Sequence, residues 1–147
     1  MTTVLDTCRR AAAVKQEIGT LGTNKKNAAL LAIADALEAN REQIKAANEL
    51  DIEAGRKNGL NEGLIDRLTL DDSRIDGVAE GCRQVAALPD PVGAVLRKIV
   101  RPNGLLIEKT SVPMGVIAII YESRPNVTSD AAALALRVGA HVGPLPP

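Results

Sequence analysis

Hydrophobic residues recur every three or four positions along the first 88 residues, with polar residues between them. This spacing predicts consecutive amphipathic helices from about residue 3 to about residue 88. The last of these helices carries a regular apolar stripe, formed by Ile75, Val78, Ala79, Cys82, Val85 and Ala86. Pro89-Asp90-Pro91 then stops the helix, so residues 1–92 are predicted to form a helical N-terminal part.

Polar residues next to the apolar stripes predict where individual helices begin. Thr23 or Asn24 is expected to cap a helix that places Lys25 and Lys26 on its solvated outer face. Asn40, followed three residues later by Gln43, resembles a capping box. Further helix starts are predicted at Asn48, for a helix that Gly59 closes, at Asn61 and at Asp71-Asp72.

Two runs of β-forming residues follow, from Ala94 to Val100 and from Leu105 to Val112. The Asn103-Gly104 pair lies between them, and Asn-Gly between two such runs is a strong hairpin signal. Residues 93–112 are therefore predicted to form a β-hairpin. A two-stranded hairpin is marginal alone, so it should pack on another element or pair with another chain.

The apolar run from Val116 to Ile120 predicts a strand covered on both faces, as in a parallel sheet. A proline-broken loop and an alanine-rich helix follow, from about Val127 to Arg137, with Asp130 in its first turn and Gly139 as its C-terminal glycine. In α/β proteins, ligands bind where such a strand ends and the next helix begins.

The sequence after Gly139 departs from this pattern. A βαβ unit requires a second parallel strand after the helix. Residues 141–147 instead contain three prolines, which a central strand does not tolerate. The predicted fold class is α/β: N-terminal helices, a β-hairpin, and the first strand and helix of a truncated sheet domain over residues 113–140. Residues 141–147 are predicted to be a divergent tail.

Composition narrows the function classes. The 18 basic and 18 acidic residues give a net charge of zero, which argues against nucleic acid or an anionic membrane as partner and favours a small molecule or a protein. The first residues have neither the basic region nor the long apolar run of a signal peptide, and no later segment is long enough to span a bilayer, so a cytoplasmic location is expected. Tyr121 is the only aromatic residue, so a core must be built from Ala, Leu, Val and Ile.

The two cysteines and the single histidine indicate no metal site. Cys8 and Cys82 have neither metal-binding nor CxxC spacing, and both are predicted to be small core-facing residues rather than nucleophiles. His141 is the only histidine, and it lies in the divergent tail.

Several segments resemble gamma-glutamyl phosphate reductase, also called glutamate-5-semialdehyde dehydrogenase, of the aldehyde dehydrogenase superfamily. The most specific is Gly115-Val116-Ile117-Ala118-Ile119-Ile120-Tyr121-Glu122-Ser123-Arg124-Pro125-Asn126-Val127-Thr128. The resemblance covers the chain up to about Ala140 and corresponds to the N-terminal portion, roughly a third, of a family member. It implies that residues 113–140 begin a Rossmann-like cofactor domain and that the hairpin is an oligomerisation element, which makes a homo-oligomer the expected assembly.

The resemblance also implies an activity for the full enzyme: NADPH-dependent reduction of L-glutamyl 5-phosphate to glutamate 5-semialdehyde and phosphate, in proline biosynthesis. A cysteine thiolate attacks the acyl phosphate and hydride reduces the thioester, so each tetrahedral state needs a donor for its oxyanion. The family's nucleophile and most of its cofactor site lie beyond residue 147. The isolated chain is therefore expected to bind no cofactor and to have no reductase activity.

Asn126 is the residue to which the resemblance assigns the oxyanion donor, although an asparagine at this position could equally cap the following helix. Arg124 could bind the phosphate or carboxylate of the substrate, or be a surface arginine. Ser123 is a weaker substrate-binding candidate, Tyr121 is expected to pack the loop, and Gly115 to meet a backbone requirement. Two other functions stay open for the chain: a non-catalytic fragment that associates with itself or with a homologous subunit, and a decaying gene product.

Overall fold

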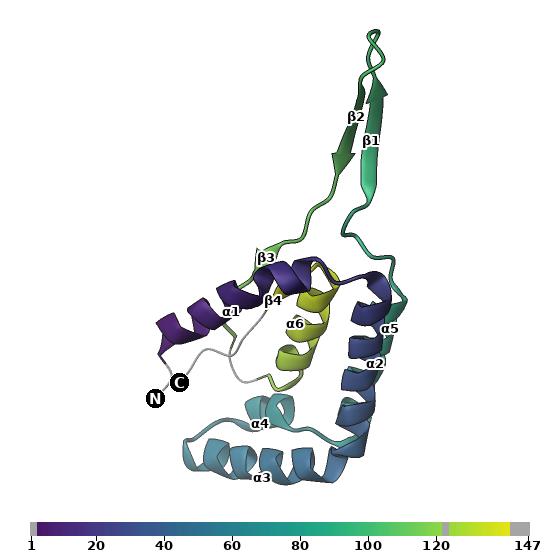
Figure 1. Ribbon diagram of the computed structural model, residues 1–147. Helices are drawn as coiled ribbons and strands as arrows, with labels where there is room; N and C mark the ends of the chain where they lie inside the picture. Colours follow the sequence, from purple (N-terminus) through teal and green to yellow (C-terminus); the bar gives the residue numbers. More distant parts are fainter. Residues whose placement is uncertain (1–2, 122–123, 142–147) are drawn as a thin grey trace.

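The computed structural model describes residues 3–121 and 124–141. Five helices come first, then a hairpin, and then a short parallel sheet with a helix between its strands (Figure 1). The elements are α1 (Val4–Gly19), α2 (Thr23–Ala39), α3 (Arg41–Lys57), α4 (Glu62–Leu68), α5 (Asp72–Ala87), β1 (Val95–Val100), β2 (Leu106–Thr110), β3 (Gly115–Val116), α6 (Asn126–Arg137) and β4 (Ala140–His141). This order confirms the predicted α/β class.

The core lies where α2, α5 and α6 pack against one another. Its buried residues are almost all small or aliphatic: Leu30, Ala34, Ala79, Cys82, Ala86 and Ala133. Alanine and cysteine allow the helix backbones to approach closely, so a core without aromatic rings can still be well packed. The predicted stripe on α5 is confirmed, since Ile75, Ala79, Cys82 and Ala86 are buried.

The helix start predicted at Asn40 is confirmed, since α3 begins at Arg41, but the predicted capping box does not form, and the start predicted at Asn48 is wrong. The side chain of Asn40 caps no helix N-terminus, because its amide donates back to the carbonyl of Ala36 at 2.8 Å. Asn48 lies inside α3, where it is buried and bridges the loop after α4: it donates to the Leu68 carbonyl at 2.9 Å and accepts from the Leu70 N–H at 2.7 Å. A partner twenty residues away thus satisfies the asparagine without ending the helix.

Other boundaries follow local signals. Asn61 and Asp71 cap α4 and α5 by accepting backbone N–H bonds, as predicted. Gly59 has a φ of +77°, which suits the glycine that closes α3. The predicted cap of α2 is displaced by one residue, because Gly22 holds the cap position and Thr23 is the first helical residue.

Lys26 is not on a solvated face, contrary to the prediction. It has no exposed surface, and its Nζ lies 3.1 Å from both carboxylate oxygens of Asp90 and 3.3 Å from the carbonyl oxygen of Arg137. Asp90 also accepts from the Thr23 hydroxyl and from the N–H of Val92. One ion pair therefore joins the start of α2, the base of the hairpin and the end of α6.

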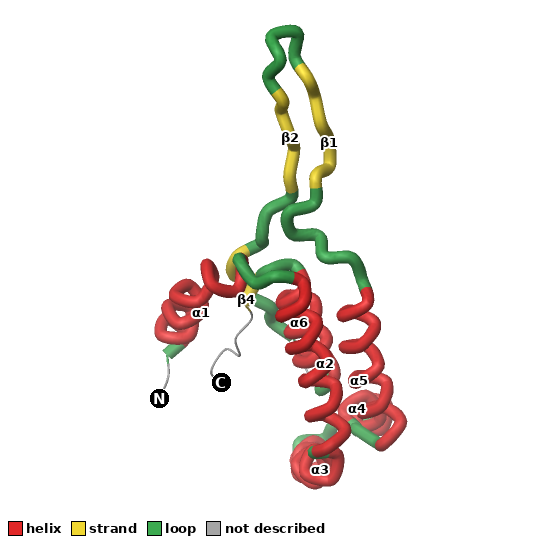
Figure 2. Tube along the Cα trace, turned by 45° about the vertical axis from the view of Figure 1, so that its right-hand side comes forward, coloured by secondary structure: helices red, strands yellow, loops and turns green. Residues whose placement is uncertain are grey.

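The hairpin stands away from the helical body (Figures 1 and 2). Strands β1 and β2 pair antiparallel, with Ile99 opposite Ile107 and Val100 opposite Leu106, and one irregularity lies between Val95 and Arg97. Gly104 in the turn has a φ of +82°, as the Asn-Gly signal requires. The predicted hairpin is confirmed within two residues at each strand end.

The parallel sheet differs from the prediction in two ways. Strand β3 contains Gly115 and only one residue of the apolar run, Val116. Val116 and Ile120 are 43% and 88% exposed, because β4 is the one strand that pairs with this segment among the described residues. The second strand does begin: Gly115 pairs with Ala140 and Val116 with His141. The prolines follow later, at residues 144–147, which lie outside the described residues, as does most of the predicted divergent tail.

Helix α1 packs on this sheet through glycines. Pro113 lies against both Gly19, at the end of α1, and Gly139, where a Cβ would come within 3.2 Å and 3.0 Å of the proline ring. Gly139 has a φ of +65°, which confirms it as the residue that closes α6, and Gly115 has a φ of +85°, as its predicted backbone role requires. A side chain at either position would require Pro113 or the backbone around it to shift.

The two cysteines have different environments. Cys82 is 1% exposed in α5, as predicted, whereas Cys8 is exposed, because α1 buries only Ala11 among the described residues of this chain. No helix in the described ranges is long and apolar enough to cross a membrane. Within the same ranges, no group of three or more His, Cys, Asp or Glu residues could hold a metal ion.

Candidate functional site

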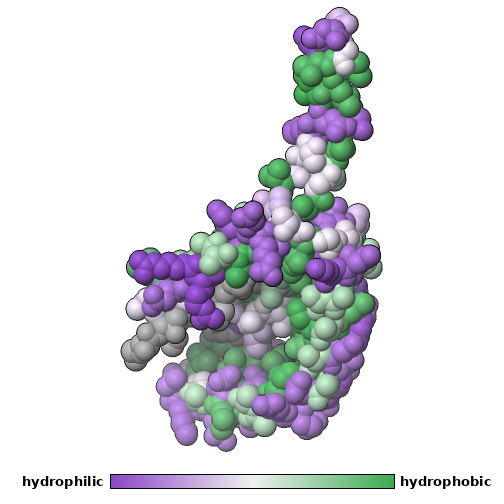
Figure 3. Space-filling view, viewed as in Figure 1, coloured by the Kyte–Doolittle hydropathy of each residue, from purple (hydrophilic) through white to green (hydrophobic). Residues whose placement is uncertain are grey.

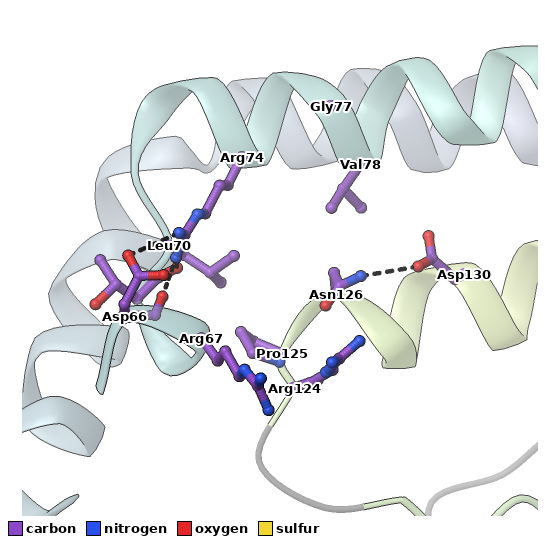
Figure 4. Close-up of a pocket in the computed structure, with 11 residues that line it drawn as sticks. Asp66, Arg67, Leu70, Arg74, Gly77, Val78, Arg124, Pro125, Asn126 and Asp130 are labelled. Carbon is purple, nitrogen blue, oxygen red and sulfur yellow. Dashed lines mark hydrogen bonds and ion pairs between the residues drawn. The ribbon is translucent and has the colours of Figure 1, made fainter. Parts of the chain in front are cut away.

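A pocket of about 400 Å³ lies where α6 begins, facing the turn between α4 and α5. Its charged and polar lining includes Asp66, Arg67, Arg74, Arg124, Asn126 and Asp130 (Figure 4). Three separate segments supply these side chains: α4 with the turn after it, α5, and the start of α6. The pocket therefore brings together two of the residues that the sequence singles out, Arg124 and Asn126.

Asn126 is the first residue of α6, after Pro125. Pro125 holds the N-cap position and Asn126 lies inside the helix, so the capping alternative is wrong. Its Nδ2 instead donates to Oδ2 of Asp130 at 3.0 Å, one turn further along α6. A primary amide has two N–H groups, so this bond fixes the orientation of the amide and leaves one N–H to donate to a ligand.

Asp130 is the fifth residue of α6, so it lies just beyond the first turn in which it was predicted. The cause is the start of the helix at Asn126, one residue before the predicted start at Val127. This shift places Asp130 directly above Asn126 on the same helix face, the i and i+4 arrangement in which side chains meet. The Asp130 carboxylate consequently accepts a hydrogen bond from the Asn126 side chain. Among the described residues it accepts none from the backbone N–H groups at the start of the helix.

The three arginines of the pocket differ in whether they have an ion-pair partner. Arg74 pairs with the Asp66 carboxylate at 2.9 Å and also donates to the backbone oxygens of Asp66 and Thr69. Arg67 and Arg124 are both exposed, and no ion pair joins either of them to another described residue. Arg67 was not predicted as a site residue, because only the folding of α4 against the start of α6 brings it there.

The loop before α6 is tied to the helix by Tyr121, whose hydroxyl makes a hydrogen bond with the Thr128 hydroxyl. Tyr121 is 46% exposed, so it fastens the loop through this polar bond rather than by burying its ring. Ser123, the second predicted substrate-binding residue, lies outside the described residues.

Neither cysteine lines the pocket. Burial raises the pKa of the Cys82 thiol, the nearby Asp130 raises it further, and Arg83 only partly opposes these effects. A thiol that is buried and has a raised pKa carries little thiolate at neutral pH and is a poor nucleophile. The pocket can therefore polarise and bind an anionic or carbonyl-containing ligand, and no cysteine lines it among the described residues.

No family model matches the chain. Curated relatives do. A gamma-glutamyl phosphate reductase from Carboxydothermus hydrogenoformans is 52% identical over 139 residues, which cover 95% of this chain and 34% of that protein. Another from Syntrophomonas wolfei is 53% identical over 131 residues, covering 89% of this chain and 31% of the relative. The chain thus spans about a third of the length of the curated relatives that it matches.

Solved structures give the same result for the fold. The crystal structure of a gamma-glutamyl phosphate reductase from Thermotoga maritima superposes with a TM-score of 0.92 at 41% identity, over 95% of this chain and 34% of that protein. The enzyme from Saccharomyces cerevisiae gives a TM-score of 0.90 at 30% identity, over 97% of this chain and 36% of that protein. In sequence and in fold, the chain is similar to the N-terminal part of the gamma-glutamyl phosphate reductases, about a third of their length.

Proposed function

We propose that this chain is the N-terminal part of a cytoplasmic reductase that converts L-glutamyl 5-phosphate to L-glutamate 5-semialdehyde and phosphate, in proline biosynthesis. The observation that carries the proposal is the amide of Asn126, which Asp130 holds at the edge of a pocket with two exposed arginines. The family likeness supplies the reaction, and the pocket supplies groups that suit an acyl phosphate.

In this proposal Asn126 donates its second amide N–H to the carbonyl oxygen of the substrate. Negative charge develops on that oxygen when a nucleophile attacks, and a donor that is already oriented stabilises the charge without reorganising. The loss of one such donor typically lowers kcat by about 10²–10³-fold. Asp130 contributes by fixing the amide and is a positioning residue.

The described residues do not form a dinucleotide cradle. Such a cradle places glycines where a strand meets a helix, so that the backbone can approach the phosphates. Here the corresponding turn ends in Arg124-Pro125-Asn126, with no glycine among the described residues between β3 and α6. We propose that NADPH is bound by parts of the full-length enzyme that this chain does not contain, and that the 147 residues alone do not reduce the substrate.

Two assays test the proposal. The purified chain, given NADP, phosphate and glutamate 5-semialdehyde, is expected to produce no NADPH. A chimera in which residues 3–140 replace the matching part of the Carboxydothermus hydrogenoformans reductase is expected to be active, and Asn126→Ala in that chimera is expected to lower kcat by about 10²-fold or more. An inactive but folded chimera, or an Asn126→Ala chimera with unchanged kcat, would overturn it.

A second function is favoured by the hairpin. Its outer edges are unpaired within the described residues, and Leu96, Val100, Leu105 and Leu106 are all more than half exposed. Figure 3 shows a band of hydrophobic surface on the hairpin near its far end. An exposed strand edge with apolar side chains is a template for pairing with another chain. We therefore propose that the hairpin associates with a second copy of this chain or with a homologous subunit.

Light scattering after size-exclusion chromatography tests this association. The double variant Val100→Thr/Leu106→Thr keeps β-forming residues at two opposed positions but removes apolar surface, and it is expected to shift the chain from dimer to monomer. Leu50→Gln on α3 is the matched control, since Leu50 is 67% exposed and lies away from the hairpin. A wild-type chain that stays monomeric at high concentration would rule out self-association.

A further inference from the structure

The pocket contains two arginines that the fold brings together from distant parts of the sequence. Arg67 lies in the last turn of α4, and Arg124 precedes Pro125 at the start of α6. Both line the same pocket, and in Figure 4 the side chain of Arg67 extends from α4 toward the segment that carries Arg124. Nothing in the local sequence of α4 marks Arg67 as functional.

The two carboxylates that line the pocket already have partners. The Asp66 carboxylate is held by Arg74, and the Asp130 carboxylate accepts the amide of Asn126. Three arginines and two aspartates line the pocket, so its lining carries one net positive charge. Because neither Arg67 nor Arg124 has an ion-pair partner among the described residues, the uncompensated charge belongs to this pair.

We propose that Arg67, together with Arg124, binds the anionic group of the ligand, a phosphoryl or carboxylate group, beside the Asn126 amide. A guanidinium offers two parallel N–H donors that match the oxygens of either group, and such charge-assisted bonds are about twice as strong as neutral ones. The start of α6 at Asn126 adds the positive end of a helix dipole. This inference rests on the proposed function and adds to it the residue on α4 that selects an anionic substrate.

The geometry suits an acyl phosphate because one such molecule could bind both the neutral Asn126 amide and the two cationic arginines. Its carbonyl oxygen requires a neutral donor, and its phosphoryl group requires cations. The volume of about 400 Å³ is within the usual range for a small-molecule site. A larger anionic partner such as nucleic acid would require a basic surface, and a chain of zero net charge with both signs interspersed does not offer one.

The test is a titration of the 147-residue chain, labelled with ¹⁵N, at constant ionic strength. Inorganic phosphate serves as the phosphoryl probe and glutarate as the carboxylate probe, with chloride as the reference salt. Saturable shifts at Gly77, Asn126 and Asp130, which line the pocket, are expected with at least one probe. The probe that binds more tightly identifies which group of the substrate the arginines hold.

Arg67→Gln is expected to weaken binding of that probe by about tenfold, because one charge-assisted pair of bonds is lost. Arg56→Gln, which removes an exposed arginine from the end of α3, is the matched control and is expected to leave the binding unchanged. Both side chains are exposed, so a dispersed amide spectrum should persist in each variant. Equal binding by wild type and Arg67→Gln, or no saturable shift with either probe, would overturn the inference.

The titration and the chimera assay distinguish failure of this inference from failure of the proposed function. An active chimera together with unchanged anion binding in Arg67→Gln would remove the role of Arg67 and leave the proposed function intact. An inactive chimera together with weakened binding in Arg67→Gln would keep the anion site and remove the proposed reaction.

Discussion

The ammonium group of Lys26 lies 3.1 Å from both carboxylate oxygens of Asp90, and the lysine has no exposed surface. The two residues are 64 positions apart in the sequence, so the pair fixes the start of α2 against the base of the hairpin. The carbonyl of Arg137 at the end of α6 completes the contact. A single lysine thus connects the helical body, the hairpin and the helix that carries the site.

Loss of one member of this pair should be costly. Lys26→Met leaves the Asp90 carboxylate largely buried without its cation, and we expect a loss of about 3 kcal/mol in the free energy of unfolding. Urea denaturation followed by circular dichroism would measure it. Lys25→Met, at an exposed neighbouring position, is the control and should change stability by less than about 0.5 kcal/mol. Similar losses in the two variants would contradict the buried ion pair.

Acid should weaken the same contact. Burial raises the pKa of Asp90, but hydrogen bonds from Val92, Lys26 and Thr23 outweigh it and hold the pKa below its ordinary value of 3.8. A carboxyl group whose pKa is lower in the folded state stabilises the fold above the unfolded pKa, and this contribution is lost as the pH falls through the folded pKa. The midpoint temperature of thermal unfolding should therefore be nearly constant between about pH 5 and 7 and should fall below about pH 4. In Asp90→Asn, this midpoint should fall less steeply with pH.

Asn48 should contribute more to the stability of the fold than an asparagine inside a helix usually does. Asn48→Ala removes two hydrogen bonds and leaves the Leu68 carbonyl and the Leu70 N–H without this partner, so we expect a loss of about 2–3 kcal/mol in the free energy of unfolding. Asn58→Ala, at the exposed end of α3, is the matched control. Chemical denaturation of both variants would measure the difference, and equal stability would show that Asn48 does not hold the α4–α5 loop.

Substitution of two glycines would distinguish the cost of backbone strain from the cost of disturbed packing. Gly93 and Gly139 both have positive φ, but a Cβ on Gly93 meets nothing within 4 Å, whereas one on Gly139 meets Pro113 at 3.0 Å. Gly93→Ala should cost only the strain of the left-handed backbone, about 1–2 kcal/mol. Gly139→Ala should cost more than that, since the proline and α1 must also move. Thermal melts of the two variants would compare them, and equal costs would argue against close packing of α1 on the sheet.

The cysteines should differ in reactivity. Cys8 is exposed, and Cys82 is buried with a raised thiol pKa, so a thiol reagent should modify Cys8 quickly and Cys82 only when the chain unfolds. Mass spectrometry after brief treatment with iodoacetamide would show one adduct on the wild type and none on Cys8→Ser. Two adducts under native conditions would mean that α5 opens readily.

Local signals predicted local features. The turn at Asn103-Gly104 and the caps at Asn61 and Asp71 depend on a few neighbouring residues, and each has the predicted structure. The assignments of Lys26 and Asn48 were wrong for the opposite reason. Both side chains are satisfied by partners twenty or more residues away, and no periodicity within one helix reveals such a partner.

The site was predicted only in part. The specific sequence around Arg124 and Asn126 drew attention to the start of α6, and the structure places both residues at one pocket. The bond from Asn126 to Asp130 depended on where α6 begins, which the sequence placed one residue too late. Arg67 could not be found, since the packing of α4 near the start of α6, rather than any motif, brings it to the pocket.

The packing of Gly19 against Pro113 and Gly139 has a consequence for the order of events during translation. Helix α1 is synthesised first, but the residues that it packs on are among the last of the described chain to leave the ribosome. At about 5–20 residues per second, α1 would wait on the order of ten seconds for its docking site. The core of α2 and α5 can form in that interval, so α1 joins a body that is already folded.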